Sequence, residues 1–219
     1  MKYLSLFFLA SSQSLAATWV KVSTTTLRLA GNLSAEDGLK FRAAIDDKIR
    51  ELVVDSGGGS VAAGLEIAEV ILNRKLKVTV EGVGFSSCAN YLFSVAPIRE
   101  IRNGLVGYHG NATACYGPDM WPKRRVELIE LGFTESQIEQ LHTTLKSQIE
   151  KERSLFNRAG VSQSIFDRSC RPDKGKGDGA EYVLLLPTGE TFKKNGIHGV
   201  IGSQSVELME NLTFKVLVD

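Results

Sequence analysis

Three successive glycines between a predicted strand and a predicted helix constrain the fold of this chain most. The segment Leu52–Ile71 reads LVVDSGGGSVAAGLEIAEVI. Its β-branched residues predict a strand over Ile49–Asp55, and the apolar spacing after the glycines predicts a helix of about 15 residues. A strand followed at once by a helix, and repeated along the chain, is typical of parallel strands joined by crossover helices.

The remaining predicted elements continue this alternation. Further strands are predicted at Thr25–Leu29, Lys77–Val80, Arg99–Ile101, Leu105–Tyr108, Tyr182–Leu186, Val200–Ile201 and Leu212–Val218. Helices are predicted after an N-cap at Ser34, over Ser86–Ser94, after a capping box at Thr134–Gln137, and over Thr191–Asn195. The Gly-rich and Lys-rich stretch Ser169–Ala180 predicts a mobile surface loop.

Composition narrows the class of protein. The chain has 219 residues, of which 43% are apolar, and a formal net charge of +1. These values predict one globular domain with a substantial core and argue against a nucleic-acid-binding face, which would be basic. No apolar run long enough to cross a bilayer follows the N-terminal region.

The N-terminus predicts an export signal. Lys2 precedes a short apolar stretch, and small residues follow it, so cleavage is expected after Ala16. On this interpretation, residues 1–16 are the signal peptide, and residues 17–219 form a single domain with a helical insertion at 111–180. The alternative is that the N-terminus is a buried strand or helix. The expected location is periplasmic or secreted.

Export makes the three cysteines relevant, because exported proteins form disulfides. Cys88, Cys115 and Cys170 allow at most one internal pair. Cys88 would lie in a packed turn beside two serines, so Cys115–Cys170 is the favoured pair.

A nucleophile and a base are suggested by the segment Glu81–Gly110, EGVGFSSCANYLFSVAPIREIRNGLVGYHG. A serine pair, Ser86 and Ser87, begins a predicted helix, and His109 ends a predicted strand. A serine hydroxyl needs a base within reach and donors for the developing oxyanion. The backbone N–H groups of Gly58, Gly59 and Cys88 are candidates for that oxyanion hole.

Each of these features also has a purely structural interpretation. A serine in a first helical turn is often a cap, a histidine after a strand is often structural, and a glycine run is often a turn. The nucleophile elbow G-x-S-x-G is absent, since Gly84-Phe85-Ser86-Ser87-Cys88 lacks the second glycine. His142 and His198 lie in a helix and a late turn, away from the serine pair.

Three motifs together resemble the Clp protease proteolytic subunit and its periplasmic relatives. The segment Ser56–Val61 is similar to the S-P-G-G-x-V motif of that family, with Gly57 in place of proline. The run that begins Ser87-Cys88-Ala89 resembles its serine helix, and Val106–Gly110 resembles its histidine strand. The segment Leu186–Gly202 is similar to its closing segment. The resemblance implies a ClpP/crotonase-like α/β fold of repeated ββα units with a mostly parallel sheet.

The same resemblance implies roles for individual residues. Ser87 would be the nucleophile and His109 its base, with the N–H groups of Gly58 and Cys88 in the oxyanion hole. Ser86 or Cys88 as nucleophile would require a shift of one residue. The third member would be Asp178 or Glu181, with Asp167 and Asp173 further off.

The implied activity is an exported serine peptidase that forms an acyl-enzyme. It would act on peptides or proteins, some of them near a membrane, as a homo-oligomer without cofactor or metal. Three alternatives stay open: a non-catalytic relative that binds a peptide or protein partner, a crotonase-type acyl-CoA enzyme, and a role for Lys174 or Lys176 as in the signal peptide peptidase A branch. An exported protein would rarely meet acyl-CoA, which disfavours the second.

Overall fold

The protein is built around one six-stranded sheet. The computed structural model describes residues 16–167, 184–212 and 216–218. The strand order is β1-β2-β3-β4-β5-β7; β1 and β2 are antiparallel and every other neighbouring pair is parallel. The strands are β1 (Thr18–Lys21), β2 (Thr26–Ala30), β3 (Glu51–Ser56), β4 (Lys77–Phe85), β5 (Ile98–Gly107) and β7 (Val200–Ile201). A small parallel pair, β6 (Leu184–Leu186) and β8 (Val216–Val218), lies beside β5.

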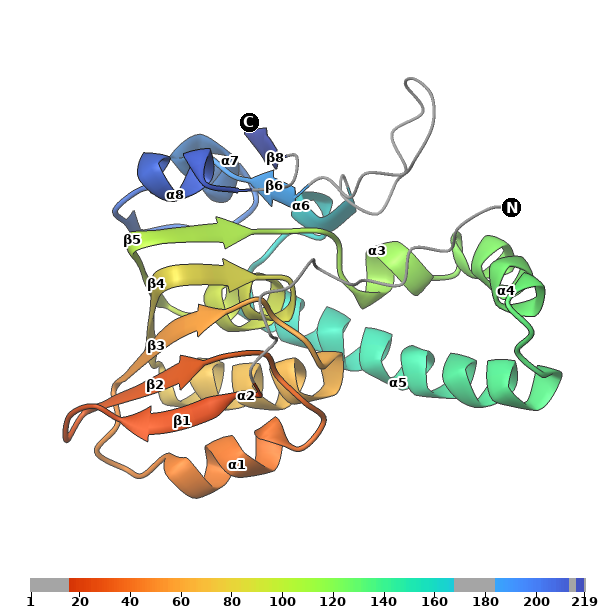
Figure 1. Ribbon diagram of the computed structural model, residues 1–219, viewed down its shortest axis with the longest axis horizontal. Helices are drawn as coiled ribbons and strands as arrows, with labels where there is room; N and C mark the ends of the chain where they lie inside the picture. The colour runs from red at the N-terminus through yellow and green to blue at the C-terminus, as the bar shows by residue number, and fades with distance from the viewer. Residues whose placement is uncertain (1–15, 168–183, 213–215, 219) are drawn as a thin grey trace.

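Helices connect and cover these strands (Figure 1). They are α1 (Asp37–Ala44), α2 (Val61–Arg74), the π-helix η1 (Cys88–Phe93), α3 (Ala112–Tyr116), α4 (Trp121–Glu130), α5 (Glu135–Ala159), α6 (Ser164–Asp167), α7 (Gly189–Lys194) and α8 (Val206–Glu210). α2 packs against α1, α5 and η1, whereas α4 and the first turns of α5 project away from the sheet. The predicted α/β class with a mostly parallel sheet is confirmed.

The glycine junction positions the chain as the sequence predicted. β3 ends at Ser56, the three glycines follow, and Ser60 caps α2 by accepting a hydrogen bond from the Ala63 N–H at 3.3 Å. The crossover α2 then returns the chain to β4, which pairs in parallel with β3. A strand, a tight turn and a helix therefore place Gly57–Gly59 at the carboxyl end of the sheet.

One pair of predicted strands is a single element. Arg99–Ile101 and Leu105–Tyr108 merge into β5, which pairs with β4 on both sides of a register shift between Val80 and Gly82. Asn103 has φ of +48° at this irregularity, a conformation that asparagine tolerates better than most residues. Asn103 and Gly104, which lie between the two predicted strands, therefore form a bulge within β5 rather than a loop.

The start of α1 also differs from the prediction. Ser34 was expected to cap the helix, but the carboxylate of Asp37 accepts from the Ser34 N–H at 2.7 Å and from its hydroxyl at 2.6 Å. The serine is the donor because the buried acid in the first helical turn needs partners. Within α1, Leu39 is 70% exposed, whereas Phe41 is buried.

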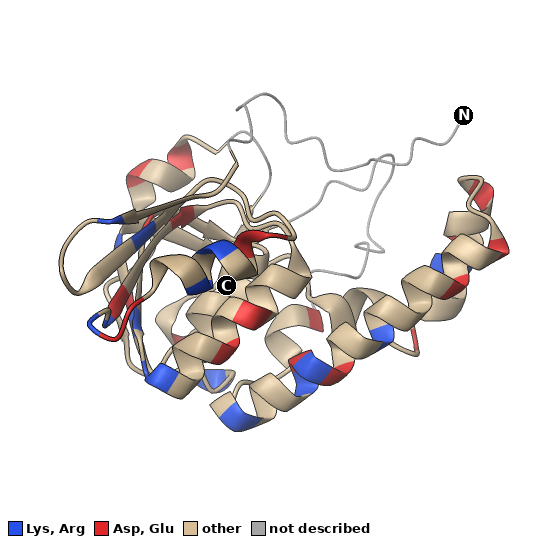
Figure 2. Cartoon of the chain, turned by 90° about the horizontal axis from the view of Figure 1, so that it is seen from below, with Lys and Arg blue, Asp and Glu red and all other residues tan. Residues whose placement is uncertain are grey.

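The long helix α5 agrees with its predicted pattern. Thr134 and Gln137 form the capping box, and Ile138, Leu145 and Ile149 are buried. Charges of both signs are mixed on the helical side of the molecule, in agreement with the near-zero net charge (Figure 2). Among the described residues, no helix has the length and apolarity that crossing a bilayer requires.

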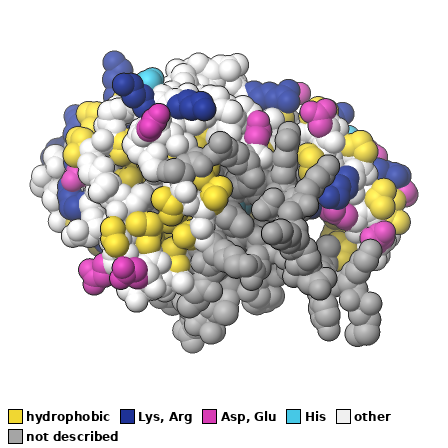
Figure 3. Space-filling view, turned by 90° about the horizontal axis from the view of Figure 1, so that it is seen from above, with side chains coloured by type: hydrophobic (Ala, Val, Ile, Leu, Met, Phe, Trp, Pro, Cys, Tyr) yellow, Lys and Arg dark blue, Asp and Glu magenta, His cyan; other side chains and the backbone are white. Residues whose placement is uncertain are grey.

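The C-terminal elements add a second, smaller apolar cluster. Leu105 of β5 packs with Leu184 and Leu186 of β6, and α8 contributes Leu208 and Met209. This buried cluster holds β6 against the end of β5. On the surface, hydrophobic side chains also gather on the face seen from above (Figure 3).

Several predictions fall outside the described residues. These are the signal peptide up to Leu15, most of the loop Ser169–Ala180, Lys174, Lys176, Asp173, Asp178 and Glu181. Cys88 is free and Cys115 is disulfide-bonded. The predicted partner, Cys170, also lies outside the described residues.

Candidate functional site

The candidate residues gather at the carboxyl ends of three neighbouring parallel strands. Gly57–Gly59 follow β3, Ser86 and Ser87 follow β4, and His109 follows β5 after one intervening residue. Phe85 pairs with Gly107, so the chain leaves β4 and β5 side by side. Ligands of open α/β sheets bind at this edge, because the loops there are free to vary while the strands hold them.

Ser86 occupies the turn between β4 and η1 in a strained conformation. Its φ is +52°, in the left-handed region that non-glycine residues rarely adopt. Its N–H donates to the Gly107 carbonyl at 3.1 Å, and its carbonyl accepts from the Asn90 N–H at 2.7 Å. Ser86 is partly exposed. Neighbouring structure therefore holds a solvent-accessible residue on a strained backbone, a combination that occurs at active sites.

Ser87, the serine preferred from the sequence, has a different environment. It is 2% exposed, and its hydroxyl donates to the Gly59 carbonyl at 2.7 Å. A methyl group at Gly64 of α2 would lie 3.3 Å from the Ser87 Cβ, so this side chain faces α2. The geometry favours Ser86, which the sequence left open, because Ser86 is accessible and the hydroxyl of Ser87 joins two loops.

Cys88, the third candidate nucleophile, lies in the core. It is 1% exposed, and burial raises the pKa of its thiol to about 12. A thiol with so high a pKa is protonated at neutral pH and is a poor nucleophile. Cys88 therefore packs η1 against the glycine junction.

The glycine junction lies directly against the serine turn. A methyl group on Gly58 would lie 2.5 Å from the Ser86 Cβ and 2.7 Å from the Phe85 carbonyl oxygen. Only glycine permits this approach, and its φ of +100° also requires glycine. The Gly58 N–H donates to Ser56 Oγ at 3.1 Å.

Gly59, a further predicted oxyanion donor, also lies against the serine turn. It forms a bridge with Leu33, and its carbonyl accepts the hydrogen bond of the Ser87 hydroxyl. Gly58 is the predicted donor that packs directly against Ser86.

His109 is half-buried at the end of β5. Burial lowers the pKa of its imidazole below the ordinary 6.5, because a low-dielectric environment disfavours the charged ring. A general base must be neutral to accept a proton, so this direction suits the predicted role. The preceding residue, Tyr108, exchanges two backbone hydrogen bonds with Leu185 of β6 at 2.9 and 2.8 Å. β6 therefore holds the strand end that carries the histidine.

Asn90 is a site residue that the sequence patterns did not indicate. It is 3% exposed, and its Nδ2 donates to the Gly110 carbonyl at 2.5 Å, next to His109. Its Oδ1 is buried and has no hydrogen-bond partner within the described residues. The signal available in the sequence was a lone amide in the apolar run CANYLF.

Glu152 was also missed, although it lies on the apolar face of α5. It is fully buried, and it accepts hydrogen bonds from Tyr91 Oη at 2.7 Å and from the N–H groups of Ala112 and Thr113 at 3.1 and 2.8 Å. Burial raises the pKa of its carboxyl, and these donors oppose that shift. Glu152 thereby ties α5 to η1 and to the segment that follows His109. A charge within an apolar stripe was the signal.

Three of the other ionisable residues considered lie within the described part of the chain. His142 stacks on Trp121 with ring centroids 4.0 Å apart, and His198 is exposed. Asp167, at the end of α6, accepts from Gln163 Nε2 at 3.4 Å. Within the described part of the chain, no group of His, Cys, Asp and Glu could hold a metal ion.

Comparison with known proteins gives a resemblance of chain path only. No family model and no curated protein matches the chain. A solved mutant of a membrane-bound stomatin-specific protease is 14% identical with a TM-score of 0.43, covering 89% of this chain and 95% of its own. A probable enoyl-CoA hydratase/isomerase from Mycobacterium abscessus is 9% identical with a TM-score of 0.32, covering 71% and 80%.

An enoyl-CoA hydratase from Mycobacterium avium subsp. paratuberculosis K-10 is 10% identical with a TM-score of 0.33, covering 68% of this chain and 89% of its own. At such values these similarities carry no functional conclusion. The function of the chain has to be inferred from its own residues.

Proposed function

We propose that the protein is a serine-type hydrolase that cleaves peptide bonds through an acyl-enzyme on Ser86, with His109 as the base. The observation that carries the proposal is that Ser86 is strained and partly exposed, and that it lies between the glycine junction and the end of β5. Gly58 packs on one side of it, and the strand end that leads to His109 is hydrogen-bonded to its N–H.

The proposed chemistry follows from these positions. His109 takes the proton of the Ser86 hydroxyl as Oγ bonds to the carbonyl carbon of the substrate. The negative charge that develops on the carbonyl oxygen is stabilised by the N–H groups of Gly58 and Ser87. The imidazolium then gives its proton to the leaving amine, the C–N bond breaks, and water hydrolyses the ester. Gly58 must first release its hydrogen bond to Ser56 Oγ.

The test compares the two serines under a fluorophosphonate probe, which reacts with activated serine hydroxyls and releases fluoride. Ser86→Ala should lose labelling, by about a thousandfold or more, because the bond-forming oxygen is gone. Ser87→Ala should keep labelling and lose some stability, since it removes the hydrogen bond to Gly59. Circular dichroism and thermal unfolding of both variants give the control for folding.

Two outcomes would contradict the assignment. Loss of labelling in Ser87→Ala but not in Ser86→Ala, with both folded, would restore the serine preferred from the sequence. Equal labelling of the wild type and both variants would reject an activated serine in this turn.

A second function, peptide binding without turnover, has one observation in its favour. The Gly58 N–H, which hydrolysis needs for the oxyanion, is hydrogen-bonded within the protein. A wild-type protein that binds peptides and resists the probe would establish this second function. Export of residues 17–219 and assembly into a homo-oligomer are also part of the proposal, and cell fractionation and sedimentation measurements test them.

A further inference from the structure

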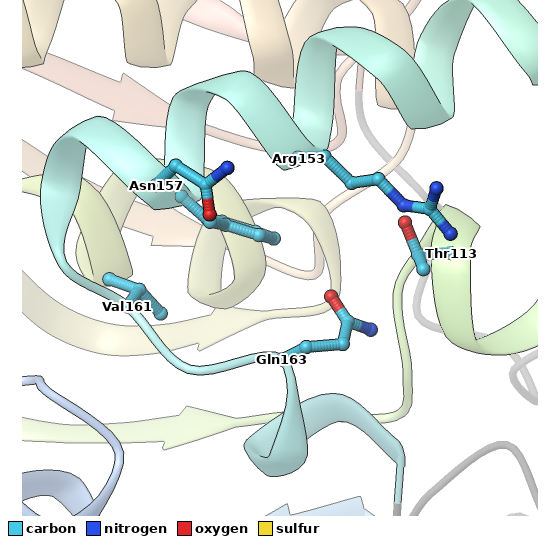
Figure 4. A pocket seen from close by; sticks show the side chains of 6 residues that line it. Thr113, Arg153, Asn157, Val161 and Gln163 are labelled. Atoms are coloured by element: carbon cyan, nitrogen blue, oxygen red, sulfur yellow. The ribbon is translucent and has the colours of Figure 1, made fainter.

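A small pocket lies next to the segment that follows His109 and has no part in the proposed chemistry. It has a volume of about 170 Å³ and is lined by Thr113, Arg153, Phe156, Asn157, Val161 and Gln163. Figure 4 shows the guanidinium group of Arg153 next to Thr113, with the amides of Asn157 and Gln163 also at the pocket. The pocket therefore lies between the C-terminal half of α5, the start of α3 and the segment before α6.

The polar groups of this pocket have unused hydrogen-bonding capacity. Arg153 and Asn157 are exposed, and their side chains make no hydrogen bond or ion pair with the described residues. The Thr113 hydroxyl is buried and faces the Glu152 carboxyl, whose pKa it helps to lower, although the contact lies outside normal hydrogen-bond geometry. The Arg153 guanidinium and the Asn157 amide are therefore the donors that a bound anion would use.

The other wall residues define the shape of the pocket. Gln163 exchanges two amide hydrogen bonds with Asn111, at 2.9 and 3.0 Å, so its side chain is fixed. Phe156 and Val161 are buried in the core and supply apolar surface. The nearby acid, Glu152, is directed toward Tyr91 and two backbone N–H groups, which offset its charge. One uncommitted guanidinium therefore faces a cavity that is partly apolar.

We infer that this pocket binds the C-terminal carboxylate of a peptide. A guanidinium group binds a carboxylate through two parallel hydrogen bonds, and the Asn157 amide offers a further donor. A phosphate group would leave the apolar wall unused and would have a single cation to balance its charge.

The location connects the pocket to peptide substrates, and this part of the inference rests on the proposed function. Thr113 follows His109 by four residues, so their Cα atoms are at most about 14 Å apart. A peptide of a few residues could span that distance. The enzyme would then act near the free C-terminus of its substrate.

The test is a binding measurement in the Ser86→Ala variant, which requires no turnover. The probe is an N-terminally fluorescein-labelled Ala-Ala-Leu peptide with a free carboxylate, compared with its C-terminal amide by fluorescence anisotropy. The acid should bind about 10-fold to 100-fold more tightly, the range for one charge-assisted contact. Unlabelled N-acetylleucine should compete if the carboxylate and its apolar side chain suffice, and longer acids should compete better if the peptide chain contributes.

Variants of Arg153 and of a nearby lysine test whether Arg153 causes the preference for the acid peptide. Arg153→Ala should remove the preference for the acid, and Arg153→Lys should retain part of it because the fork geometry is lost. Lys151→Ala, an equal loss of charge at an exposed position of the same helix, should preserve the preference. Equal affinity for acid and amide, or an unchanged preference in a folded Arg153→Ala variant, would overturn the inference. Acid-selective binding with no probe labelling of the wild type would reject the hydrolase and retain the pocket.

Discussion

Polar residues of the described structure have partners in one region of the sheet and are strained or unpartnered in another. On one face of β2–β5, seven charged side chains form a network, here called the sheet-face network. Its members are Arg28, Glu51, Asp55, Lys77, Glu81, Glu100 and Arg102. At the carboxyl ends of β3–β5, Ser86 is strained and the Oδ1 of Asn90 is buried without a partner in the described structure.

The difference separates polar residues that stabilise the fold from polar residues that remain able to contact a ligand. In the sheet-face network, Lys77 lies 2.5 Å from Glu100, and Arg102 lies 2.8 Å from Glu100 and 2.9 Å from Glu81. Those charges already have partners and contribute to folding. At the strand ends, strain and unused capacity persist because the surrounding packing enforces them, which is the pattern of a functional site. Changes at the strand ends should therefore affect activity, and changes in the network should affect stability.

His109 should give the largest effect after Ser86 itself. His109→Ala should slow fluorophosphonate labelling by about 10²-fold to 10⁴-fold, because a general base is lost. In the wild type, the labelling rate should fall as the pH drops through a value below 6.5, since burial lowers the pKa of His109 and protonation removes the base. The measurement is the labelling rate against pH, in a range where the fold is intact.

His142→Ala is the matched control for this prediction. His142 of α5 stacks on Trp121 of α4, and its replacement should leave the pH profile unchanged. A wild-type midpoint above 6.5, or the same profile in His109→Ala, would show that another group is the base.

Gly58→Ala should give the next largest effect. The added methyl group would lie 2.5 Å from the Ser86 Cβ, which displaces either the serine or the N–H donor. Labelling should fall by about 10²-fold to 10³-fold, the range for loss of one oxyanion donor. Labelling kinetics and thermal unfolding are measured together.

Gly132→Ala separates backbone strain from damage to the site. Gly132 also has a positive φ, +85°, but a methyl group added there would have no other atom within 4 Å among the described residues. The substitution should cost about 1 kcal/mol of stability and no labelling. If Gly58→Ala loses no more labelling than Gly132→Ala, the close approach to Ser86 has no catalytic role.

Glu100→Gln should give the smallest effect, and only on stability. Arg102 and Lys77 lower the pKa of the Glu100 carboxyl to about 2, from an ordinary 4.5. Its stabilisation is therefore present above about pH 4.5 and is lost as the pH falls toward about 2. Because the partners are partly exposed, we expect a loss of about 1 kcal/mol or less at pH 7, smaller still at high salt.

Denaturant unfolding at pH 7 and at about pH 2.5 measures this difference, with probe labelling as the control. A difference between wild type and Glu100→Gln that grows as the pH falls would contradict the linkage. Reduced labelling at pH 7 in a stable variant would show that the sheet-face network and the strand ends are coupled.

Local patterns in the chain were enough to predict the alternation of strands and helices, the glycine junction and the capping box of α5. Each of these depends on residues within a few positions of one another, so their spacing could be read directly. The same patterns indicated that the serine pair and His109 follow strands. Parallel pairing then brings them to the same edge of the sheet.

The choice of the presented serine, in contrast, required the packed fold. Ser86 and Ser87 are chemically identical neighbours, and they differ in the left-handed φ of one and in the contact of the other with Gly59 and α2. No spacing rule could pair Glu152 with Tyr91, or leave Arg153 unpaired beside Thr113 in the described structure. Such contacts join residues tens of positions apart, and their geometry is set by how whole elements pack rather than by any local pattern.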